Sequence, residues 1–265
     1  MTPGPERVHA KRPVRRRTSW RKRRRIRLFF EALVCLLALG GIGYSFTNYV
    51  SASPRFQIKR VTVEGANVLD EGDILAQAGV TQVDNLILMD TAVVQERVEA
   101  MPYVATCTIQ RAYPDKLIIR VYERRPVATL QVANRAFELD ETFTVLREIH
   151  PMGPHPGPLL SDVPGLEVVE VGEVLENDVL AEAFDVWRAY TTTPLAQELT
   201  LSEIAAYSTD EILMYINELP YEIRWGRTNP FEQAERLSVL WEEKLGVLPC
   251  ALYLDLRLGE NIPCK

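Results

Sequence analysis

The stretch RAYPDKLIIRVYERRPVA, residues 111–128, decides the fold of this chain. Proline and aspartate at Pro114 and Asp115 favour a turn between two extended segments, residues 104–111 and 116–122. In the second segment alternate residues share a face, which groups the apolar side chains Leu117, Ile119 and Val121 and leaves the charged ones mainly on the other side. The stretch therefore predicts a β-hairpin with one buried face and one charged face.

A strand and two short helices are expected before this hairpin. Residues 56–65 alternate in polarity as a strand does, and they end at a glycine. The first helix is predicted to begin at an Asp70 N-cap and to end at Gly79, and the second to run from an Asp90 cap to Pro102. The order strand, helix, helix, strand, strand predicts an α+β domain over residues 54–125, with two helices on one side of its sheet.

The charge of the chain is unevenly distributed. The net charge is −6, yet residues 1–27 contain twelve Lys or Arg and a single acid. Residues 28–50 are largely apolar, with Glu31 as their one charged residue. At ~1.5 Å per residue the uncharged part from Ala32 onward roughly spans a ~30 Å hydrocarbon core. Because excess Lys and Arg mark the cytoplasmic flank, we predict a basic cytoplasmic tail (1–27), a single transmembrane helix (28–50) and an extracytoplasmic remainder.

Three other interpretations of the N-terminal basic and apolar segments explain the sequence less well. A cleavable signal peptide would find small residues at positions 51–53, but Pro54 follows directly and the apolar run is long, which favours an uncleaved anchor. The pair Arg24-Arg25 faintly resembles a twin-arginine export signal, but such pairs arise by chance among so many arginines. Nucleic-acid binding by the basic tail would also use these charges, although membrane topology explains them more simply, so no nucleic acid is expected as a partner.

A second, mixed β-rich domain with flanking helices is expected over residues 126–265. Strands are predicted at 127–132, 135–139, 144–149, 204–207 and 211–216, and a Pro- and Gly-rich loop at 150–158. A helix is expected at about 177–190, and the clearest helix begins at the Asn229 cap with Pro230 in its first position. Residues 251–265 alternate, which places Leu252, Leu254, Leu256 and Leu258 on one face, and a short last strand is expected from Asn261.

Residues that could carry catalysis are sparse. His9 lies in the basic tail, and His150 and His155 lie in the proline-rich loop, where their spacing offers no helical face for a metal. Acid pairs such as Asp140-Glu141 are interpreted as solvated turn residues. We therefore expect no enzymatic activity, no metal site and no cofactor. Of the three cysteines beyond the apolar segment, Cys250 and Cys264 are the favoured pair, and at least one thiol stays free.

The order of elements beside a single anchor resembles a POTRA domain, and two segments, residues 113–117 (YPDKL) and 121–128 (VYERRPVA), are similar to the FtsQ/DivIB family of bacterial cell-division proteins. Val163-Pro164-Gly165 resembles a further segment of that family, and residues 253–257 (YLDLR) resemble its closing strand. The resemblance implies a POTRA domain followed by a β-domain. It also implies a non-enzymatic scaffold of the inner membrane, concentrated at the division septum, with its C-terminal domains in the periplasm.

The resemblance further implies FtsB- and FtsL-like partners, which would bind by β-strand addition at the C-terminal edge and so recruit and regulate septal cell-wall synthesis. The corresponding residues here are Arg257, Leu258, Glu260, Asn261, Ile262 and Cys264. Leu258 and Glu260 depart from the family pattern of an aromatic and a small hydroxyl, so different side-chain anchors are expected. Pro263 is expected to remove one donor from the edge. A frayed chain end is the simpler alternative.

A second family surface, which serves other division proteins, would correspond to Ile109 and Arg111 in the first hairpin strand, where ordinary core and solvated roles are the alternative. The competing function is a POTRA-containing transport or secretion protein of the envelope. Such proteins usually carry an outer-membrane barrel with many alternating ten-residue strands, and this sequence does not show them.

Overall fold

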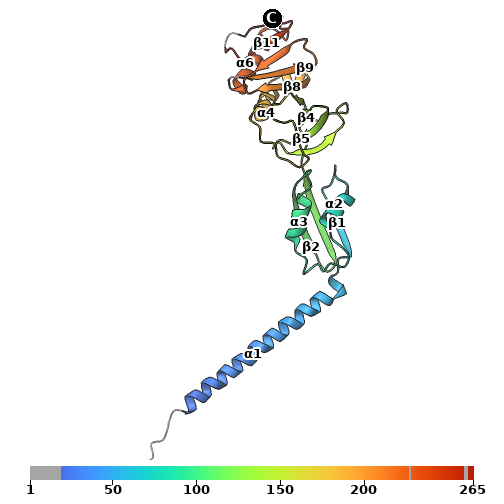
Figure 1. Ribbon diagram of the computed structural model, residues 1–265, viewed down its shortest axis with the longest axis vertical. Coiled ribbons are helices and arrows are strands. Elements are labelled where there is room, and N and C mark those ends of the chain that lie inside the picture. The colour runs from blue at the N-terminus through green and yellow to red at the C-terminus, as the bar shows by residue number, and fades with distance from the viewer. Residues whose placement is uncertain (1–18, 227, 260–261) are drawn as a thin grey trace, which may run out of the picture.

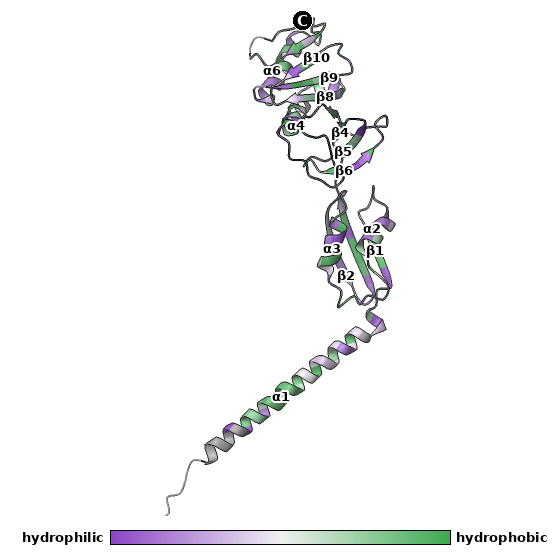
Figure 2. Cartoon of the chain, viewed as in Figure 1, coloured by the Kyte–Doolittle hydropathy of each residue, from purple (hydrophilic) through white to green (hydrophobic). Residues whose placement is uncertain are grey.

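The computed structural model describes residues 19–226, 228–259 and 262–265 (Figure 1). Helix α1, Ser19–Ala52, leads into a first domain made of two helices and a small sheet, and a larger sheet-rich second domain follows. The α+β fold class predicted from the sequence is thereby confirmed. Within the described residues, one stretch, Arg27–Ser51, is long and apolar enough to cross a membrane, and it colours as the hydrophobic part of α1 in Figure 2. The helix itself begins earlier than the predicted residue 28.

The first domain has a three-stranded sheet in the order β1-β3-β2. Strand β3 (Lys116–Glu123) lies in the centre, parallel to β1 (Arg60–Glu64) and antiparallel to β2 (Val104–Ala112). Helices α2 (Glu71–Ala78) and α3 (Thr91–Glu99) bury their apolar sides against one face. The two helices begin where the sequence predicts, because the predicted caps accept hydrogen bonds from backbone N–H groups two residues on. The fully buried side chains of this domain include Ile58, Ile74, Leu86, Val98, Leu117 and Ile119.

The second domain is built on an eight-stranded sheet in the order β11-β10-β9-β8-β7-β4-β5-β6. Antiparallel β8-β9-β10 and antiparallel β4-β5-β6 are joined in its middle, where β7 pairs in parallel with both β4 and β8. Strand β11 extends the sheet by pairing in parallel with β10. Helices α4 and α6 pack on the face that carries the core. The elements are β4 (Ala128–Val132), β5 (Arg135–Leu139), β6 (Val145–Ile149), β7 (Leu159–Ser161), α4 (Asp178–Thr191), α5 (Leu195–Glu198), β8 (Leu201–Ser208), β9 (Glu211–Ile216), β10 (Glu222–Trp225), α6 (Pro230–Glu243) and β11 (Tyr253–Asp255).

The proline-rich loop, residues 150–158, connects β6 to β7 in this sheet. It carries the chain from β6 back to the centre, where the N–H of Thr129 donates to the carbonyl of Pro158 at 3.0 Å. Gly157 sits at φ +63°, and a Cβ atom there would lie 1.8 Å from the carbonyl oxygen of Val127. Only glycine allows this close approach, so the loop composition serves the insertion of β7 between β4 and β8.

Buried charges join the two domains. Asp140, interpreted from the sequence as a solvated turn residue, is only 4% exposed, and it accepts a hydrogen bond from Arg124 at 2.7 Å. Burial alone would raise the pKa of Asp140, but the N–H of Thr144, the Arg124 guanidinium and Thr142 outweigh it and hold that pKa below its usual value. The interpretation as a solvated turn was wrong because a local pattern does not show that a cation from the preceding domain reaches the carboxylate.

A second carboxylate completes this junction. Glu138, which is also 4% exposed, accepts a hydrogen bond from the hydroxyl of Tyr103 in the first domain. Arg147 pairs with the same carboxylate through two N–H groups at 2.8 Å each, and its guanidinium lies over the Tyr103 ring. The two domains are thus connected by paired charges as well as by the covalent chain.

The junction yields a stability prediction with a neighbouring control. Arg124→Ala should lower the free energy of unfolding by about 2 kcal/mol, because it withdraws a charged hydrogen-bond partner from a buried carboxylate. Arg125→Ala removes the same side chain from an exposed position, so a change within ~0.5 kcal/mol is expected. Urea unfolding of both variants measures the difference, and equal losses would contradict the role given to Arg124.

Candidate partner-binding edge

The last described residues form one edge of the large sheet. After β11 the chain turns and returns antiparallel beside it, with a bridge between Leu254 and Cys264. The N–H of Asp255 donates to the carbonyl of Pro263 at 3.0 Å, and the N–H of Lys265 donates to the carbonyl of Tyr253 at 3.1 Å. We call residues 262–265 the terminal segment. It is an isolated bridge and not the regular strand expected from Asn261. The predicted site residues Glu260 and Asn261 lie outside the described residues.

The hydrogen-bond pattern determines which backbone groups point outward. In an antiparallel pair, alternate residues direct both N–H and C=O to the same side. Because Pro263 and Lys265 face β11, the backbone groups of Ile262 and Cys264 face away from the sheet. The nitrogen of Pro263 therefore lacks its hydrogen on the inner side. The expectation that Pro263 removes a donor from the free edge was wrong, because the missing donor would have faced β11 and not a partner.

The other edge of the sheet is different. Strand β6 is flanked by residues 172–175, where the N–H of Gly172 donates to the carbonyl of Val145 at 2.8 Å and the N–H of Val145 donates to Glu173 at 2.8 Å. These contacts occupy backbone groups that an incoming strand would need. Of the two edges of the large sheet in the described part of the chain, the terminal segment is the better template for strand addition.

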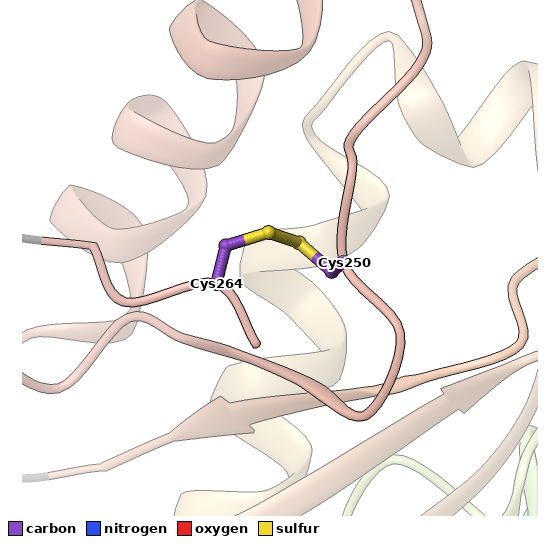
Figure 3. The surroundings of a disulfide bond; sticks show 2 residues. All are labelled: Cys250 and Cys264. Atoms are coloured by element: carbon purple, nitrogen blue, oxygen red, sulfur yellow. A yellow bond between two sulfur atoms is a disulfide. The ribbon is translucent and has the colours of Figure 1, made fainter.

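A disulfide holds the terminal segment in place. Cys250 and Cys264 are bonded, as the sequence favoured, and Figure 3 shows the bond linking the segment to the chain before β11. Cys107, by contrast, is a fully buried free thiol. Burial raises the pKa of this thiol to about 11, so it stays protonated near neutral pH.

Arg257 is engaged inside its own domain. The guanidinium of Arg257 pairs with both oxygens of Asp255 at 2.9 and 2.7 Å. The backbone N–H of Arg257 also donates to the same carboxylate at 3.0 Å. Burial opposes ionisation of Asp255, but these bonds outweigh it and lower the pKa of the carboxyl. Arg257 therefore shapes the turn into the terminal segment, and the side chain offers a partner less than the sequence suggested.

The sequence predicts that the four alternating leucines share one face, but their exposures differ. Leu254 and Leu256 are completely buried, whereas Leu252 and Leu258 are 60% and 51% exposed. The reason is that β11 has only three residues, so the alternation does not extend past the turn. Ile262 borders an open groove of about 520 Å³ beside α6. The other residues that line the groove are Glu232, Glu235, Arg236, Val239, Leu240 and Glu243.

The two site residues predicted in the first domain lie on β2, at the edge of the small sheet. Ile109 packs against the core under the helices, and Arg111 donates to the carbonyl of Met89 at 2.6 Å. Glu99 accepts the outward N–H of Cys107 at 2.8 Å, so this edge is partly occupied by its own chain. The hydrogen bonds from Gln95 and Cys107 lower the pKa of Glu99, which keeps the carboxylate ionised.

Comparisons with known proteins show which proteins this chain is similar to. Residues 56–124 match the family model described as "POTRA domain, FtsQ-type". The cell division protein FtsQ of Syntrophotalea carbinolica is 24% identical over 96% of this chain and 94% of its own length. FtsQ of Mycobacteroides abscessus is 28% identical over 78% of this chain and 62% of its own length. The chain is thus similar to FtsQ cell-division proteins over nearly its whole length. FtsQ of Streptomyces bingchenggensis is 30% identical over about half of each chain.

The match over residues 56–124 identifies the first domain as an FtsQ-type POTRA domain. The named relatives are cell-division proteins, and among the described residues no group of His, Cys, Asp or Glu side chains is arranged to hold a metal ion. The sequence places a partner-binding site at this edge through its resemblance to the FtsQ family, and that site stays a prediction. The sequence missed the groove beside α6, whose only sequence signal was the charged face of a clear helix.

Removal of the disulfide should loosen the edge formed by the terminal segment. A Cys250→Ser, Cys264→Ser double variant should lose about 3 kcal/mol of unfolding free energy, the chain-entropy value for a loop of this length. Cys35→Ser, in α1, should leave the unfolding of the second domain unchanged. Urea titrations of the three proteins under oxidising conditions provide the test, and an unchanged midpoint in the double variant would contradict the stabilising role of the bond.

Proposed function

We propose that this protein is a non-enzymatic scaffold of the cell-division machinery that recruits FtsB- and FtsL-like proteins and regulates septal cell-wall synthesis. The match to the FtsQ-type POTRA domain and the similarity to FtsQ proteins support the role in division. In this proposal α1 spans the inner membrane once, the basic tail lies in the cytoplasm, and both folded domains lie in the periplasm. The protein acts by binding, at the septum, and its partners carry out the chemistry.

The observation that carries the proposed binding mode is the direction of the terminal backbone. Ile262 and Cys264 turn their N–H and C=O groups away from β11, and an incoming strand satisfies such groups with backbone hydrogen bonds. Backbone pairing tolerates the departures at Leu258 and Glu260, because it does not depend on side-chain identity. The exposed side chain of Leu258 and the groove beside Ile262 then supply specificity.

Order in the free protein also favours this edge. The disulfide and the Asp255–Arg257 ion pair fix the segment on both sides of its turn before any partner arrives. Association loses less conformational entropy when the binding segment is already ordered. Arg257 acts here as a positioning residue, whereas Ile262 and Cys264 provide the contact. Glu260 and Asn261 complete the proposed edge, and Ile109 and Arg111 remain a proposed second surface for other division proteins.

The proposed role is tested by localisation in dividing cells. A fluorescent fusion of the full chain should form a band at midcell before constriction, because a division scaffold assembles at the septum. A fusion that contains only residues 1–53 is the matched control for the anchor. A uniform envelope signal from the full chain throughout the cell cycle would refute the division role.

The binding mode is tested by separating a backbone donor from its side chain. Ile262→Pro removes the outward N–H and should reduce co-purification of an FtsB-like partner by about tenfold, since a lost interfacial hydrogen bond typically costs about 1.5 kcal/mol. Ile262→Ala keeps that N–H and controls for lost packing. Pro263→Ala adds a donor on the inner side only, so its recovery should match the unmodified chain. If Ile262→Pro and Ile262→Ala bind equally well, strand addition at this edge is excluded.

A further inference from the structure

The membrane-facing end of the POTRA domain carries exposed apolar side chains. Val83 is 78% exposed, Leu88 57% and Tyr113 62%. Apolar side chains that gather at one end of a domain mark an interaction surface more than single exposed ones do. They come from two loops, one between α2 and α3 and one between β2 and β3. Together with the exposed cations Arg55, Lys59 and Arg60, we call them the juxtamembrane patch.

Hydrogen bonds hold both loops against the chain that leaves α1. Asn85 donates from its side-chain nitrogen to the carbonyl of Val50, in the last turn of α1, at 2.7 Å. The N–H of Ile58 then donates to the carbonyl of Asp84 at 3.0 Å. On the other side, the N–H of Lys59 donates to the carbonyl of Asp115 at 2.9 Å. The two loops therefore flank the exit of α1 directly, as Figure 1 shows for the lower end of this domain.

The length of α1 determines where the patch lies relative to the lipid headgroups. The apolar stretch Arg27–Ser51 has 25 residues, which at ~1.5 Å per residue is longer than a ~30 Å hydrocarbon core. Its last turn consequently reaches the headgroup region, where the exposed ring of Tyr49 suits the interface. Asn85 is bonded to that same turn, so its loop lies at the level of the lipid headgroups.

We infer that the juxtamembrane patch rests in the lipid interface, with Val83, Leu88 and Tyr113 inserted among the headgroups and upper acyl chains. Lys59 and Arg60 both approach Asp115, at 3.7 and 3.4 Å, which reduces their net attraction for anionic lipid. Apolar insertion therefore provides most of the contact, and the cations lie near the lipid phosphates. The lipid contact limits the directions in which the rest of the protein extends from the bilayer.

Lipid is the expected contact of the patch because the patch adjoins the end of α1. A lipid surface surrounds the end of any helix that spans a bilayer, and the patch is hydrogen-bonded to that end. This inference rests on the proposed membrane span, so the experiment reports on α1 separately. Cys35 lies within α1 and is exposed, whereas Cys107 is buried and the remaining two cysteines are bonded to each other. A thiol-reactive fluorophore on the unmodified chain therefore reports the insertion of α1.

The test uses the full chain reconstituted in bilayers of phosphatidylcholine and phosphatidylglycerol. Val83→Cys in a Cys35→Ala background carries a bimane label on the patch. Val68→Cys in the same background is the matched control, since Val68 is also an exposed valine, 52% accessible, at the opposite end of β3 beside Glu123. A doxyl group near the lipid carbonyl should quench the label at position 83 several-fold more than at 68, and iodide in the water should quench it several-fold less.

Each other outcome is decisive. Equal iodide quenching at positions 83 and 68 would show that the patch lies in water and would overturn the inference. A label at 83 shielded from both quenchers would indicate a second copy of the protein over the patch, which overturns it too. If the label on Cys35 is itself not quenched by lipid, the membrane span fails and not only the patch. Leu88→Glu with Tyr113→Glu, both at exposed positions, should abolish lipid quenching at 83 while the melting temperature is retained.

Discussion

The buried carboxylates of Glu138 and Asp140 are the constraint on which the arrangement of this protein depends. A buried charge is tolerated only when it is paired and hydrogen-bonded. Here the partners come from both sides of the domain junction: Tyr103 and Arg124 precede it, and Arg147 follows it. Movement of one domain relative to the other would break the Arg124–Asp140 and Tyr103–Glu138 contacts and leave each carboxylate with only the partners of its own domain. These contacts therefore link the two domains, with α1 at one end and the terminal segment at the other (Figure 1).

The same rule explains why this edge of the large sheet is suited to binding. Asp255 is buried, and Arg257 neutralises it from within the turn, so the chain is ordered up to the point where it reverses. The disulfide then holds the returning segment against β11. Charge pairing and covalent bonding act on neighbouring residues, and their combined effect is an ordered outer edge. The opposite sheet edge, beside β6, has its backbone groups partly occupied by residues 172–175.

Local signals in the sequence predicted the local structure well. Caps such as Asp70, Asp90 and Asn229 predicted helix starts, because a cap acts through bonds to residues two or three positions away. The sequence did not predict the parallel pairing of β7 with β4 and β8, because those partners are distant in the chain. The direction in which Pro263 faces was missed for a similar reason. Residue type determines whether a donor exists, and only the pairing with β11 determines the side on which it is missing.

The edge at β2 and the edge at the terminal segment differ in a way that bears on partner choice. Strand β2 of the POTRA domain is longer than the terminal segment, yet Glu99 already accepts the outward N–H of Cys107. An incoming strand at β2 must displace a carboxylate whose lowered pKa reflects these same hydrogen bonds. At the terminal segment, an incoming strand meets backbone groups that face outward from an edge fixed by its disulfide. Edge length alone would favour β2, whereas the cost of displacing Glu99 favours the terminal segment, so a strand-forming partner should prefer the second domain.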